Sequence, residues 1–148
     1  MESLISTPAA TAGMIAAMIF FLTALLTGSW KYFCIRNSAT AEAPVYVNIA
    51  HRAALMYSFA ALLLAVFASL SAFSNTVNLV AICLPLFYFA LAIVRYIFLG
   101  LTNTTNNQHL NPPSRIGELV LLSSLIVAET GGFLVLATGF LLRVMQSS

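Results

Sequence analysis

Long apolar segments dominate the chain, and short polar stretches separate them. No charged residue occurs over positions 3–30 or 53–94, and a polar cluster at 74–76 divides the second of these segments. Each piece exceeds the roughly 20 apolar residues that a helix needs to cross the hydrocarbon core of a bilayer. The pattern predicts an all-α fold, in which one integral membrane domain over residues 1–148 holds four transmembrane helices, at about residues 9–29, 49–73, 77–100 and 116–142.

The composition agrees with this prediction and argues against a soluble domain and against a nucleic-acid-binding protein. Apolar residues make up 61% of the chain and charged residues 7%, whereas soluble domains carry about 25% charged residues. The net charge of +2 comes without a basic block, so no nucleic-acid partner is expected. The first apolar segment lacks the basic start and the short core of a secretory signal, and we expect it to remain as the first span.

The basic residues are distributed asymmetrically. Arg143 stands on one predicted side, and the other five lie in or beside the loops that join the first helix to the second and the third to the fourth. Positive-inside bias predicts that both loops are cytoplasmic and both termini outside, which in a bacterium means the inner membrane. The five residues on the predicted cytoplasmic side are Lys31, Arg36, Arg52, Arg95 and Arg115.

Ionisable side chains gather near this predicted cytoplasmic face. His51 and Arg52 open the second helix, Arg95 and Tyr96 close the third, and Glu118 opens the fourth. Groups this costly at membrane depth usually face the bundle interior or a wet cavity and mark function. The alternative is that each arginine extends toward lipid phosphates.

One face of the third predicted helix carries much of the candidate chemistry. Tyr88, Ala92, Arg95 and Tyr96 follow an i, i+4, i+7, i+8 spacing, and we expect them to line a pocket together with His51. A neutral imidazole binds metal or haem iron, a phenol donates to a developing oxyanion, and arginine holds a carboxylate or propionate. The chain has no C-x-x-C-H run, so any haem would lack thioether links.

The second predicted helix carries a stripe of small residues. Its members recur at alternating intervals of three and four, which forms a continuous seam on one helix face. Such seams let membrane helices approach closely, and this one would direct a histidine into an interface. The seam consists of His51, Ala54, Ser58, Ala61, Ala65, Ala68 and Ala72.

A second carboxyl lies deeper in the fourth predicted helix. Glu129 is near the bilayer centre, where a charge costs at least ~2.5 kcal/mol, and we expect it to be protonated or paired. Its spacing from Glu118 is three helical turns, so both carboxyls point the same way. Gly131 and Gly132 would let a helix or a flat ligand approach. A structural carboxyl bonded to a neighbouring helix remains the alternative. His109, in the polar loop before this helix, is expected to be solvated.

Over nearly its whole length the layout resembles styrene oxide isomerase. The resemblance rests on the Gly-containing first segment "TAGMIAAMIFFLTALLTG", on Ala50 and His51 opening the second helix, and on Tyr96 before an Asn-rich, Pro-containing loop. Tyr96 falls where that family has its catalytic tyrosine. Tyr57 and Tyr88 stand where we would expect its helix-2 asparagine and helix-3 aspartate.

This resemblance implies a homotrimer in which His51 binds ferric haem b between protomers. Arg52 or Arg95 would hold the propionates, and Tyr96 or Tyr57 would steady the oxyanion. The iron would act as a Lewis acid on a small apolar epoxide and rearrange it to an aldehyde without net redox change.

Arg95 with Tyr96, and Arg52, also look like parts of the signatures of the membrane-associated eicosanoid and glutathione metabolism proteins, which are four-helix trimers too. That resemblance implies glutathione as the ligand. Arg52 and Arg95 would hold its carboxylates, and Tyr96 would hydrogen-bond its thiol. The usual glutamate on the second helix is absent, because no acid occurs between Glu42 and Glu118.

The leading prediction is therefore a haem-dependent isomerase, with a glutathione-dependent enzyme as the alternative. A third possibility is a non-catalytic membrane protein or a transporter that uses Glu129. Small four-helix multidrug exporters usually carry their glutamate in the first helix, which here has no charge, so transport ranks below both enzymes.

Overall fold

Four long helices make up the chain in a computed structural model that describes residues 7–110 and 112–147. They are α1 (Pro8–Arg36), α2 (Val45–Leu70), α3 (Asn75–Thr102) and α4 (Arg115–Ser147). Each is long and apolar enough to cross a membrane. The predicted all-helical class with four apolar helices is confirmed, and it indicates a multi-pass membrane protein.

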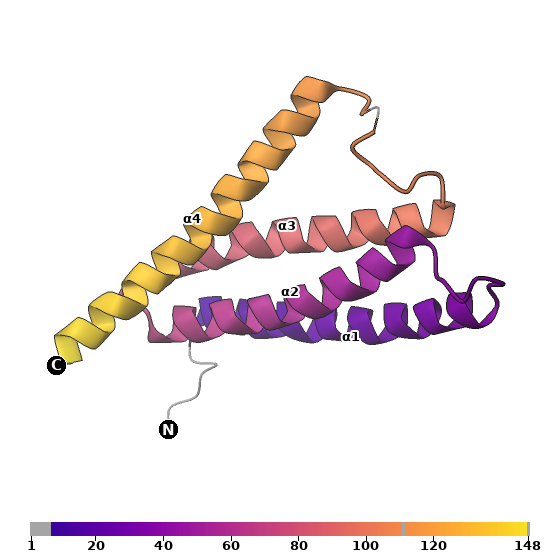
Figure 1. Cartoon of the computed structure of the whole chain (residues 1–148). Coiled ribbons are helices and arrows are strands. Elements are labelled where there is room, and N and C mark those ends of the chain that lie inside the picture. The colour runs from indigo at the N-terminus through magenta and orange to yellow at the C-terminus, as the bar shows by residue number, and fades with distance from the viewer. Residues whose placement is uncertain (1–6, 111, 148) are drawn as a thin grey trace.

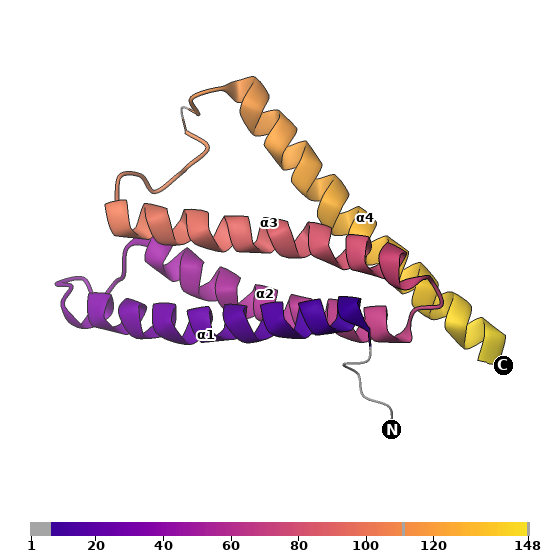
Figure 2. The same ribbon diagram turned by 180° about the vertical axis from the view of Figure 1, so that it is seen from behind.

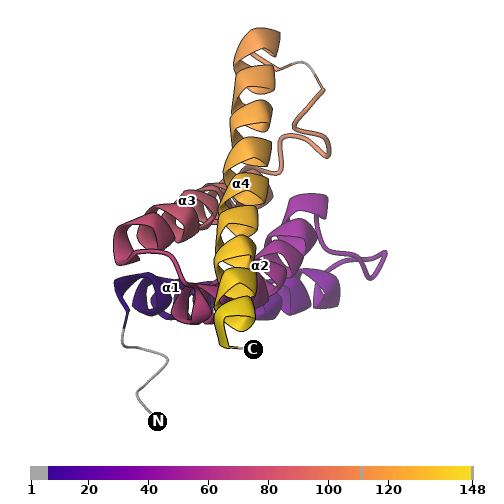
Figure 3. The same ribbon diagram turned by 90° about the vertical axis from the view of Figure 1, so that its left-hand side faces the viewer.

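α4 is arranged differently from the other three helices. α1, α2 and α3 contact one another and run roughly side by side, whereas α4 crosses them obliquely (Figures 1 and 2). Within the described residues, α4 contacts α2 and α3 but not α1. Its central turns, which carry its buried residues, lie against them. Its C-terminal end projects beyond the other helices, and its N-terminal half diverges from α3 toward the α3–α4 loop (Figures 1 and 3).

Local sequence signals explain where α1 begins and where α3 begins and ends. The Thr7 hydroxyl accepts from the backbone N–H of Ala10 at 3.2 Å, and proline follows at the first helical position, a favoured N-terminal arrangement. The Ser74 hydroxyl caps α3 in the same way. α3 ends where Asn103 adopts the left-handed conformation with φ 45°, which asparagine tolerates better than most residues.

The observed bounds differ from the predicted ones at several ends. α1 continues beyond position 29 to Arg36, because the aromatic and basic residues that follow the apolar segment are compatible with a helix. α2 begins earlier than predicted, directly after Pro44, a residue that suits the start of a helix but not its interior. It ends at Leu70 because Ser71 is extended and its hydroxyl accepts from the N–H of Phe73.

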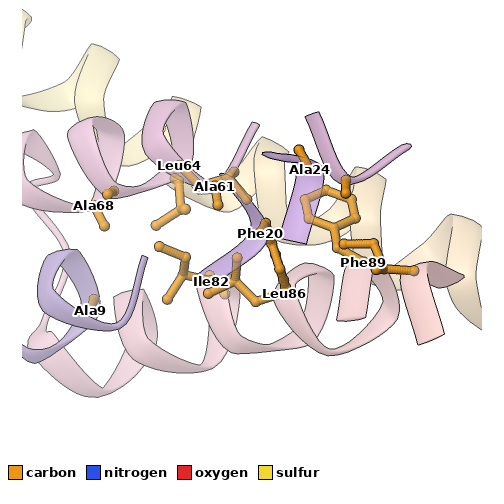
Figure 4. Packing of buried hydrophobic residues seen from close by; sticks show 14 residues of the cluster. Ala9, Phe20, Ala24, Ala61, Leu64, Ala68, Ile82, Leu86 and Phe89 are labelled. Atoms are coloured by element: carbon orange, nitrogen blue, oxygen red, sulfur yellow. The ribbon is translucent and has the colours of Figure 1, made fainter. Parts of the chain in front are cut away.

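The seam of small residues on α2 forms the centre of the core. Ala54, Ala61 and Ala65 are almost completely buried, and an added Cβ at Gly13 of α1 would lie only 2.7 Å from the Ala65 side chain. Figure 4 shows Ala61 among the larger side chains of this cluster, which include Phe20 of α1. Small residues allow this close approach, so the predicted packing role of the seam is confirmed.

A proline and a glycine shape the contact between α3 and α4. Pro85, inside α3, has no N–H to donate to the carbonyl of Ala81 one turn earlier. Gly132 of α4 lies so close to that carbonyl oxygen that no side chain fits there. Further along, the N–H of Ala72 donates to the carbonyl of Gly139 at 3.0 Å. The glycines therefore let α4 approach α3 and the α2–α3 turn at backbone distance.

Candidate functional site

His51 lies in the interface between α1 and α2. Its Nδ1 is 2.9 Å from the carbonyl oxygen of Ala24. An added Cβ at Gly28 would be 2.9 Å from the ring's Cε1, so the glycine makes room for the imidazole. A carbonyl only accepts, so in the neutral ring Nδ1 carries the proton and Nε2 the lone pair. None of the described residues hydrogen-bonds Nε2. Metal-binding histidines are commonly oriented in this way.

Gly28→Ala is expected to disturb this arrangement. The new methyl group would contact the imidazole too closely, and the ring would have to give up its hydrogen bond to Ala24 or shift with α2. This overlap costs about 1–3 kcal/mol, whereas alanine favours a helix over glycine by up to about 1 kcal/mol. We therefore expect a net loss of about 1 kcal/mol of unfolding free energy, measured in detergent, and a change in the Nδ1 signal of His51 in nitrogen NMR. Gly117→Ala is the matched control, because its added Cβ meets only ordinary contacts at 3.4 Å. An unchanged His51 signal in Gly28→Ala would contradict the prediction.

A cavity of about 390 Å³ lies between α3, the α3–α4 loop (residues 103–110 and 112–114) and the N-terminal half of α4. Tyr88, Ala92, Arg95 and Tyr96 all line it, as their spacing along the helix predicts. His51 does not line it, because it packs against α1 instead. The structure therefore divides the predicted pocket into two separate places.

The charged groups of this cavity are unevenly paired. Glu118 accepts a hydrogen bond from Nδ1 of His109 at 2.5 Å. Arg95 is exposed on the cavity wall and forms no ion pair with any described residue. His109 remains about half exposed, but its contact with Glu118 goes beyond the expectation of a merely solvated ring. At the deeper end, the Tyr88 hydroxyl donates to Ser124 at 2.8 Å.

Two aromatic stacks join α2 to α3, and one of them includes a residue of the cavity lining. Tyr96 stacks on Tyr46 of α2 with ring centroids 6.1 Å apart, and the Tyr46 hydroxyl accepts from the backbone N–H of Gln108 at 2.7 Å. Tyr57 stacks on Phe89 at 4.3 Å and does not line the cavity. Tyr46 was not among the predicted site residues, although it lies 11 residues, or three helical turns, before Tyr57 and so projects from the same face of α2.

Glu129 presents a buried polar atom. Its Oε1 is buried and has no hydrogen-bond partner in the described part of the chain. Of the two neighbouring glycines, Gly132 packs against α3, whereas Gly131 faces open space. The expectation that Glu129 is protonated or paired stays a prediction.

The remaining predicted residue, Arg52, is exposed on α2 next to His51. Among the described residues, no three His, Cys, Asp or Glu side chains come together as a metal site. A metal held by protein groups alone would usually need three or four such ligands, whereas haem iron can be held by a single histidine.

Comparison with protein-family models, with curated proteins and with solved structures finds no match for this chain. Its class is therefore defined by the fold, as a protein of four apolar, membrane-length helices. Both resemblances and the functions they imply remain hypotheses.

Proposed function

We propose that the protein is a membrane-embedded haem b protein that isomerises a small apolar epoxide to an aldehyde, with His51 as the iron ligand. The orientation of His51 carries the proposal. Its Nδ1–H is bonded to the Ala24 carbonyl, which leaves Nε2 with a lone pair and no partner among the described residues. This is the arrangement in which an imidazole binds a metal ion.

The residue that follows His51 in the sequence suits a haem in its chemistry. Arg52 is exposed one position further along α2 and would hold a propionate by paired hydrogen bonds. When bound, ferric haem would supply a Lewis acid that polarises an epoxide oxygen.

Phenols of this chain would stabilise the oxyanion that forms as a C–O bond opens. The hydroxyls of Tyr96 and Tyr57 form no hydrogen bond with other described residues and are available to donate. The hydroxyl of Tyr88 already donates to Ser124. Tyr96 and Tyr57 are therefore the preferred catalytic residues, and Tyr88 is the weakest of the three candidates. Because Tyr96 lines the α3–α4 cavity and His51 does not, Tyr96 would act on substrate at an iron held between protomers of the proposed trimer.

The assembly we propose is a homotrimer in the bacterial inner membrane, with the α1–α2 and α3–α4 loops cytoplasmic and both termini outside. The placement of both loops at the same end of the bundle supports this orientation (Figure 1). The basic residues of the chain lie mostly in or beside these loops, in agreement with positive-inside bias.

An absorption spectrum of the detergent-purified protein, expressed with ample iron and haem precursor, tests the proposal. We expect a Soret band corresponding to about one haem per chain, together with aldehyde formation from small apolar epoxides. A colourless protein from haem-replete cells would overturn it. The glutathione hypothesis would then be tested next by direct binding, ahead of transport or an accessory role.

A further inference from the structure

We propose that the cavity between α3 and α4 binds a second ligand, a single-chain lipid with an anionic oxygen head group. His51 is not part of this site, although Tyr96 is in its lining, and the proposal does not rest on the haem chemistry. The head group would bind Arg95 near the loop end of the cavity, and the acyl chain would lie along the leucines deeper between the two helices.

The cavity has the polarity that such a ligand requires. Arg95, Gln108 and His109 line its loop end, whereas Leu91 and Leu125 line its walls. Tyr88 lies seven residues before Arg95 on α3, about 10 Å deeper along the helix axis. The volume of about 390 Å³ lies within the ~300–1,000 Å³ typical of small-molecule sites, and it suits one acyl chain better than two.

The charges of the cavity favour an anion. Arg95 is the one fixed cation in the lining, and it has no acidic partner among the described residues. Glu118, the carboxylate in the same lining, is held by His109. The loop thus engages the acid that would otherwise be available to Arg95. A guanidinium at membrane depth is costly without a partner, and an anionic oxygen group supplies one through charge-assisted hydrogen bonds.

The ligand would enter from the bilayer. The N-terminal half of α4 diverges from α3 (Figures 1 and 3). Two of the three leucines of this half that border the cavity, Leu121 and Leu122, are exposed. An acyl chain could therefore slide between the helices while its head group stays at the polar end.

Native mass spectrometry of the full chain, from nanodiscs of neutral phosphatidylcholine, would test this site. The probes are hexadecanoic acid, hexadecyl phosphate and the neutral alcohol hexadecanol, each titrated separately. We expect the two anions to bind at least about tenfold more tightly than the alcohol, the equivalent of one charge-assisted hydrogen bond. A preference for one of the two anions would distinguish a fatty acid from a phosphate lipid as the natural ligand.

Arg95→Gln should remove this preference, and Arg95→Lys, which keeps the charge but loses the paired geometry, should retain part of it. Arg115→Gln is the matched control, because Arg115 lies near the same end but outside the cavity lining. Equal binding of anions and alcohol by the wild type would overturn the proposal, as would an unchanged preference in Arg95→Gln or competition between glutathione and the anions.

The measurement needs no haem. A colourless protein that binds the anions would overturn the proposed function and support this site. A protein that shows the Soret band but binds the anions and the alcohol equally would support the proposed function and overturn this site.

Discussion

His51→Ala is expected to abolish the Soret band of the purified protein while the assembly survives. The substitution removes the proposed iron ligand itself. Losing only a residue that orients a metal ligand costs about 10–100-fold in affinity, so we expect at least that loss here. The folded state should tolerate the change, because the half-buried ring contributes one hydrogen bond, to Ala24, worth about 1 kcal/mol. Haem content per chain and native mass measure the two effects.

The second histidine of the chain provides a matched control. His109 lies in the α3–α4 loop, where its ring bonds Glu118, and it does not contact the α1–α2 interface. His109→Ala should therefore keep haem at the wild-type level. Normal haem content in His51→Ala would contradict the proposed function, and a selective loss in His109→Ala would assign the iron to the loop histidine.

Gly132→Ala is expected to destabilise the fold strongly. The added methyl group would overlap the backbone carbonyl oxygen of Ala81 and crowd Pro85. A backbone atom cannot rotate away as a flexible side chain can, so α4 must move from α3. Overpacking of this kind costs about 1–3 kcal/mol. Unfolding of the protein in detergent, followed by circular dichroism during titration with a denaturing detergent, would measure the loss.

The adjacent glycine supplies the control for this prediction. An added Cβ at Gly131 meets no atom within 4 Å, and alanine favours a helix over glycine by up to about 1 kcal/mol. Gly131→Ala should therefore be neutral or slightly stabilising. Equal destabilisation by the two substitutions would show that α4 does not pack on α3 through Gly132.

The four helices could be predicted from the sequence because each segment must satisfy its backbone hydrogen bonds by itself, and this requirement depends only on the local sequence. A bilayer offers no water to the backbone, so each long apolar segment must satisfy its own hydrogen bonds as a helix. Spacing within one helix was equally informative. It predicted the buried seam that centres on Ala61, and it placed Tyr88, Arg95 and Tyr96 on a common face, because residues three, four, seven and eight apart project from the same side.

Only the tertiary structure shows which faces of the helices contact one another. His51 and Arg95 were expected in one pocket because they lie at similar predicted depth, yet His51 packs against Ala24 of α1 whereas Arg95 faces α4. The pairing of His109 with Glu118 likewise depends on how the loop returns to α4. In a chain that is apolar on almost every side, hydrophobicity alone does not orient one helix toward another. Close backbone contacts at glycine, such as that of Gly132 with α3, determine the orientation, and they depend on the whole packing arrangement.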